Sequence, residues 1–263
     1  MGVLLLLLAC SGSPTEDELP PPEPPPVQHG KLDPTQLEQA ERALVAPTAE
    51  ETRMAVEKAG LGSLGSLVPE RNYKLDVPDK DRVALRTGVL LADTVLTVRD
   101  AENDSLVKLL RQVEEGLGQL EAQPRVVSTV GELAGQLEND AIDREELVKT
   151  LDEATARAQE DLGEHGRFVQ AGAWLAGSNL VAQAVLKKGD ATYAGLLLKQ
   201  PDVAHYYLDY VRSPEGQKKA GADIAAALAD TLESLLTISE KDGLGLEDVE
   251  VIQDKTQDIL DLI

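Results

Sequence analysis

The stretch from residue 168 to residue 186, FVQAGAWLAGSNLVAQAVL, contains no charged side chain, although charged residues make up 27% of the chain. A helix that is apolar on nearly all sides is normally a buried, central one. The stretch approaches the ~20 apolar residues that a membrane span needs, but Gln170, Asn179 and Gln183 would each be costly in lipid. We therefore predict a buried helix around which the other helices pack.

The rest of the chain shows helical periodicity and no sustained alternation of apolar and polar residues, so we predict no sheet. The expected fold class is all-α, a multi-helix bundle with a buried central helix, formed by residues 33–263. The helices 126–137 and 143–162 are expected on the outside. The expected helices begin at Asp33 and then cover 48–59, 78–100, 106–120, 126–137, 143–162, 168–186, 190–199 (capped by Asp190), a helix opened by Pro201, 214–239 and 247–262.

One sequence pattern occurs twice. GVLLADTVL at 88–96 and GAWLAGSNL at 172–180 share Gly, Leu, Ala and Leu at matching places, 84 positions apart. Gly and Ala four residues apart form a flat strip on a helix, which another backbone can approach closely. The pattern has two interpretations, a duplicated helical unit or a coincidence in a chain rich in Leu and Ala.

The formal charge of -22 and the pI near 4.4 exclude some classes of partner. Nucleic acid needs a basic protein face, and anionic lipid attracts basic segments. A strongly acidic surface keeps a protein soluble through self-repulsion. Binding of cations or basic partners is the alternative interpretation.

The amino terminus carries a short apolar run, MGVLLLLLAC, which ends in the single cysteine of the chain. The run has the length of the apolar region of a signal peptide. Leu7-Leu8-Ala9-Cys10 closely resembles the lipobox of bacterial lipoproteins. That resemblance implies a signal peptide over residues 1–9, cleavage before Cys10 and acylation of its thiol, so that the membrane is a partner through this lipid. Ser11 after the cysteine, in place of the Asp of inner-membrane retention, implies the outer membrane.

Residues 10–32 comprise the cysteine and a proline-rich segment that includes PPPEPPP at 20–26. Polyproline rises ~3.1 Å per residue, so this segment predicts a disordered tether on the order of 60 Å long. A proline-rich docking ligand is the alternative. The helices around 88–93 and 171–177 loosely resemble those of all-helical lipoproteins of the cell envelope, a resemblance that implies no activity.

Residues with catalytic or ligand chemistry are few. The three histidines, His29, His165 and His205, fall outside known metal-ligand spacings, so we expect no metal site. Residues 60–65, GLGSLG, match the dinucleotide pattern G-x-G-x-x-G, but they follow a helical pattern instead of a strand, and we expect no cofactor.

Aromatic residues are concentrated late in the chain, where six of the seven lie between residues 168 and 210. Small-ligand sites are usually apolar and aromatic with a few polar groups. The interpretation that these rings close the edge of the core, with their hydroxyls in water, stays open, as does bonding of the two amides to neighbouring helices. The candidate ligand-binding residues are Trp174, Asn179, Gln183, His205, Tyr206, Tyr207 and Tyr210.

These features together predict a lipid-anchored helical module in the periplasm, which binds an envelope protein or a small ligand and is not an enzyme. The alternative is an envelope enzyme with a site near Tyr206–Tyr210.

Overall fold

A computed structural model describes residues 46–62, 64–219 and 222–263. These residues form helices and no strand, which confirms the predicted all-α fold. The helix expected from Asp33, the lipobox and the proline-rich segment lie outside the described residues. The helices are α2 (Ala49–Lys58), α3 (Lys80–Thr97), α4 (Asn103–Gln119), α5 (Pro124–Glu138), α6 (Arg144–Asp161), α7 (Glu164–Lys188), α8 (Ala194–Leu198), α9 (Pro201–Arg212), α10 (Pro214–Lys219), α11 (Ala222–Ser239) and α12 (Leu246–Leu262).

Capping side chains fix several helix starts. Thr48 forms a reciprocal capping box with Glu51 at the start of α2. Asp79 accepts a hydrogen bond from the Arg82 backbone N–H at 3.1 Å, so α3 begins after Asp79.

One expectation near α8 needs correction. Asp190 does not cap α8, because its carboxylate accepts from the Thr192 backbone N–H at 2.9 Å and thus closes a turn before the helix. The single long helix expected over 214–239 is described as α10 and α11, on either side of residues 220–221, which lie outside the description.

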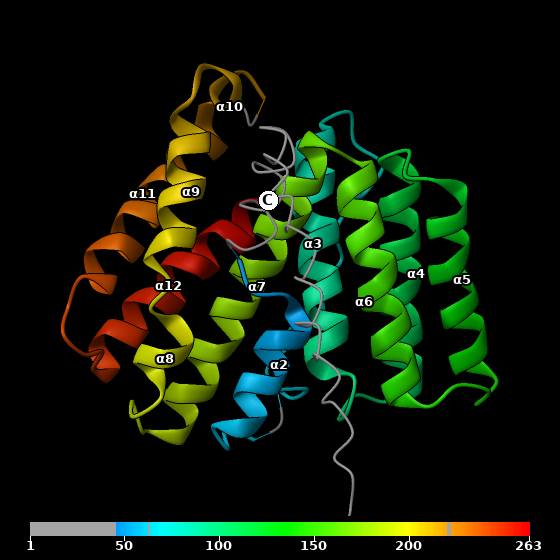
Figure 1. The fold of residues 1–263 in the computed structure, drawn as a ribbon, viewed down its shortest axis with the longest axis horizontal. Coiled ribbons are helices and arrows are strands. Elements are labelled where there is room, and N and C mark those ends of the chain that lie inside the picture. The colour runs from blue at the N-terminus through cyan, green and yellow to red at the C-terminus, as the bar shows by residue number, and fades with distance from the viewer. Residues whose placement is uncertain (1–45, 63, 220–221) are drawn as a thin grey trace, which may run out of the picture.

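The predicted central helix is α7, which begins four residues earlier than expected and ends at Gly189, whose φ is 67°. It packs against α3 and α12 along its length and against α6, α8 and α2 at other points. Figure 1 shows α4, α5 and α6 on one side of α3 and α7, and α9, α11 and α12 on the other. As expected, α5 lies at the outer edge. In the described part of the chain no helix is long and apolar enough to span a membrane.

The two repeated motifs meet each other at the centre of the fold. A Cβ atom placed on Gly88 of α3 would lie 1.9 Å from the backbone oxygen of Val169, and one placed on Gly172 of α7 would lie 2.1 Å from the backbone oxygen of Leu85. Val169 follows Leu85 by 84 positions, the same offset that separates the two glycines. The contact is therefore reciprocal, and each motif supplies the flat strip on which the other backbone rests.

A buried ion pair joins the segment before α3 to the core. The Arg71 Nε lies 2.6 Å from the Asp93 Oδ2, and Asp93 is completely buried. Burial raises the pKa of Asp93 to about 6, despite the opposing attraction of Arg71. Arg71 also donates to the Tyr73 hydroxyl at 3.3 Å, and that hydroxyl donates to the Leu260 backbone oxygen of α12 at 3.2 Å.

Candidate ligand-binding site between α7 and α9

Aromatic rings fill the space between α7 and α9. Trp174 of α7 lies 5.7 Å from Tyr207 of α9, centroid to centroid, and Tyr207 contacts Tyr206 edge to face at 5.2 Å. Phe168 contacts Tyr210 edge to face at 5.5 Å. The backbone of α9 packs closely against α11. Large aromatic side chains thus separate α9 from α7, whereas Gly88 and Gly172 let the backbones of α3 and α7 approach closely.

Helical spacing explains why these rings meet. Phe168, Ala171 and Trp174 recur at intervals of three along α7, so they share one face of the helix. On α9, Tyr207, Tyr210 and Val211 are three and four residues apart and face the same way. Neighbouring side chains of a helical face thus come together without any long loop.

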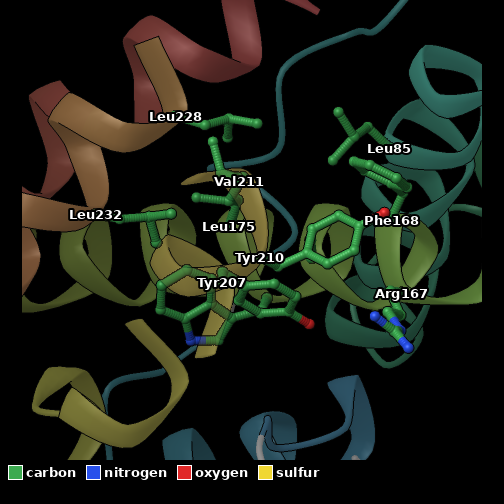
Figure 2. A pocket seen from close by; sticks show the side chains of 11 residues that line it. Leu85, Arg167, Phe168, Leu175, Tyr207, Tyr210, Val211, Leu228 and Leu232 are labelled. Atoms are coloured by element: carbon green, nitrogen blue, oxygen red, sulfur yellow. The ribbon is translucent and has the colours of Figure 1, made fainter. Parts of the chain in front are cut away.

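A narrow pocket lies among these rings (Figure 2). Its enclosed volume is about 20 Å³, and the whole hollow, including its open mouth, is about 380 Å³. The exposed lining of the enclosed part is apolar. Apart from the aromatic rings and Arg167, the walls are formed by Leu85, Ala171, Leu175, Val211, Leu228 and Leu232.

The hydroxyls of Tyr206 and Tyr207 are not in water. This excludes, for these two residues, the interpretation that the rings close the edge of the core with their hydroxyls in water. The hydroxyl oxygens of Tyr206 and Tyr207 are buried and have no hydrogen-bond partner among the described residues. Leaving such a group unsatisfied costs about 1–3 kcal/mol. The Trp174 indole, in contrast, donates to Gln200 Oε1 at 2.6 Å.

Burial, followed by the neighbouring Tyr206, holds the pKa of Tyr207 well above its ordinary value, and the positive charge of Arg167 partly opposes this. Tyr207 is therefore a neutral hydroxyl at physiological pH, able to donate a hydrogen bond. The Arg167 guanidinium lies 5.3 Å from the centroid of the Tyr210 ring, in the range of cation–π contacts.

Of the predicted residues, Trp174, Tyr207 and Tyr210 line the pocket, Tyr206 contacts Tyr207 without lining it, and three others lie elsewhere. His205 is exposed on the outer face of α9. Asn179 is completely buried and donates to Gln253 O and to Thr256 Oγ1 of α12, each at 3.0 Å. Gln183 donates to Asn179 Oδ1 at 2.6 Å. Asn179 thus joins α7 to α12, which was the alternative interpretation of its role, whereas Gln183 bonds within α7.

Arg167, Gln200 and the leucines of α11 were not predicted for the site. Arg167 directly precedes the charge-free stretch, so a boundary drawn by charge left it out. Gln200 lies directly before Pro201, the first residue of α9, and a helix start in that position was the only available signal. Leu228 and Leu232 fall in the helix expected over 214–239, and no role was predicted for them.

The sequence also raised the questions of a histidine site, a metal site and a dinucleotide site. His165 Nδ1 lies 2.8 Å from Asp81 Oδ1, at the starts of α7 and α3. No group of His, Cys, Asp and Glu side chains that could hold a metal ion is present within the described ranges. Gly60 and Gly62 have φ values of 62° and 82° in a loop after α2, so this glycine pattern follows a helix and lacks the strand of a dinucleotide site.

Comparison with known proteins adds no relative: no protein-family model matches the chain, and neither a curated protein nor a solved structure matches it at a significant level.

Proposed function

We propose that this protein is a lipid-anchored helical binding module of the bacterial cell envelope. The observation that carries the proposal is the sequence Leu7-Leu8-Ala9-Cys10, which resembles a lipobox in both residue types and position. The proline-rich segment that follows has the composition of a tether. Ser11 favours the outer membrane, with the helical domain in the periplasm.

Binding suits the pocket between α7 and α9 better than catalysis does. General acid–base catalysis needs a group whose pKa lies near the working pH. The pKa of the Tyr207 hydroxyl is raised, which moves it further from neutral pH, and His205 is exposed and does not line the pocket. A neutral hydroxyl in an apolar pocket is suited to orienting a bound molecule. These features favour a binding module over an envelope enzyme at Tyr206–Tyr210.

The anchor is tested by expressing the wild-type chain and Cys10→Ser in a diderm bacterium fed an alkyne-bearing palmitate analogue. We expect the label and the membrane fraction to contain the wild type only, because serine lacks the thiol that is acylated. Ser13→Ala serves as a matched control and should behave like the wild type. Equal membrane recovery of Cys10→Ser and the wild type would refute the anchor.

A second substitution tests the location. Ser11→Asp introduces the residue associated with inner-membrane retention, so it should move the labelled protein from the outer-membrane to the inner-membrane fraction on a sucrose gradient. If Ser11→Asp and the wild type both sediment with the inner membrane, the outer-membrane assignment is wrong.

A further inference from the structure

The pocket between α7, α9 and α11 has an apolar exposed lining, and Arg167 and the buried Tyr207 hydroxyl lie at one side of it. Leucines and a valine from α3, α7, α9 and α11 form the walls. In Figure 2 the hydroxyl ends of Tyr207 and Tyr210 point toward the side of the pocket on which Arg167 lies. A ligand that fits this arrangement has an apolar part and a polar end.

The Tyr207 hydroxyl indicates which hydrogen-bonding group the polar end of the ligand carries. Its side chain is only 5% exposed, and its hydroxyl has no hydrogen-bond partner among the described residues. Because the raised pKa keeps this hydroxyl protonated, it can donate to an acceptor that enters the pocket. The ligand should therefore carry a hydrogen-bond acceptor at its polar end.

Arg167 identifies the charge of that end. It is half-buried at the pocket and stacks on the Tyr210 ring. Over the described part of the chain it forms no ion pair with a carboxylate, although the formal charge of the chain is -22. An arginine at the entrance of an apolar pocket is suited to a carboxylate or phosphate group.

We infer that this pocket binds a single-chain amphipathic anion, in the simplest case a fatty acid. The acyl chain lies among the leucines of α7 and α11, and the anionic group lies against Arg167 and the Tyr207 hydroxyl. This inference rests on the proposed function as a binding module and names the class of its ligand.

The pocket as it stands is too small for an acyl chain. The hollow of about 380 Å³ includes the open mouth and the solvent there. Its enclosed part, about 20 Å³, holds roughly one water molecule. The pocket must therefore open on binding, and α9 can move outward because it meets α7 through side-chain rings, whose rotamers can change.

Trp174, the single tryptophan of the chain, lines the pocket and reports on its occupancy. The experiment uses the full-length chain carrying Cys10→Ser, which keeps it free of acyl groups of its own. Trp174 emission is titrated with decanoate and with 1-decanol, both below the concentrations at which they aggregate. We expect a saturable change with decanoate and at least tenfold weaker binding of 1-decanol, which has the same chain without the charge.

Two variants locate the anionic group. Arg167→Gln should remove the preference for decanoate over 1-decanol, and Tyr207→Phe, which keeps the ring, should weaken decanoate binding roughly fivefold or more. His205→Gln, on the exposed face of α9, is the matched control and should bind like the parent chain. Circular dichroism and melting temperature establish that each variant is folded.

Equal binding of decanoate and 1-decanol, or unchanged decanoate binding in both variants, would overturn the inference. A Trp174 signal that responds to neither compound would also overturn it and would leave the hollow as a gap in the core. Acylation of Cys10 is measured separately, so the anchor can stand when the ligand fails.

Discussion

The α3–α7 crossing predicts a large loss of stability from one of the smallest substitutions, Gly88→Ala. The added Cβ would lie 1.9 Å from the Val169 backbone oxygen, and 2.9 Å from the Ala173 backbone nitrogen. Ordinary contacts begin near 3.4 Å, so the helices must separate by about 1.5 Å. Both obstructing atoms belong to the α7 backbone, and no flexible side chain can yield.

The expected magnitude follows from the packing that is lost. A gap of ~0.5–1 Å already removes about a quarter to a half of the attraction between facing atoms, and α3 and α7 face each other along most of their length. Overpacking usually costs ~1–3 kcal/mol and sometimes more, against a gain of up to ~1 kcal/mol in helix propensity. We expect a net loss of about 2–4 kcal/mol, or roughly 5–15 °C in melting temperature.

Gly118→Ala is the matched control, because Gly118 lies in α4 and a Cβ there would meet nothing within 4 Å. That variant should be more stable than the wild type by up to ~1 kcal/mol. Gly88→Ala and Gly172→Ala combined should cost less than the sum of the two, since both separate the same helices. Calorimetry and urea unfolding measure the three single variants, the double variant and the wild type. If Gly88→Ala and Gly118→Ala melt within 2 °C of each other, the reciprocal close contact is not present.

Two further predictions concern buried polar groups. The pKa of Asp93 is raised to about 6 in the folded state, so its contribution to stability is complete below about pH 4 and is lost as the pH rises through 6. In urea unfolding, the stability of the wild type relative to Asp93→Asn should therefore fall by about 1 kcal/mol from pH 5 to pH 7. An equal pH dependence of the two proteins would contradict this. Asn179→Leu removes the acceptor of Gln183 and the donor to Thr256, so it should cost about 1–3 kcal/mol, whereas Gln183→Leu, at a half-buried position, should cost less; the reverse order in the same assay would show that the α12 contact contributes little.

The fold class and the central helix were predictable because they depend on local patterns. A stretch of 19 residues without charge has to be buried whatever surrounds it, and α7 covers all of that stretch. The expected helix starts at residues 48 and 143 coincide with the capping side chains of Thr48 and Asp143. The cap predicted at Asp190 was wrong, because aspartate can also close a turn.

Contacts between distant residues were not predictable in the same way. Asp93 is a charged residue of α3, but it is completely buried against Arg71, 22 residues earlier in the chain. Nothing in the local sequence distinguishes a carboxylate that faces water from one that faces a guanidinium. The partner of Asn179 on α12 is a similar case, since the amide indicates that a partner is needed but does not identify it.

The size of the residues on α7 explains both the crossing and the pocket. On the face toward α3, Gly172 lets the two backbones touch. On the face toward α9, Phe168 and Trp174 extend to rings on α9, so these two helices stand apart and enclose the hollow. The aromatic composition of the region indicated large side chains, and the helical spacing put them on one face, but the pocket exists only because α11 supplies leucines on the remaining side. A ligand would therefore act on the weaker of the two contacts of α7: it can displace rings along α9, whereas the backbone contact with α3 has no movable side chain to give way.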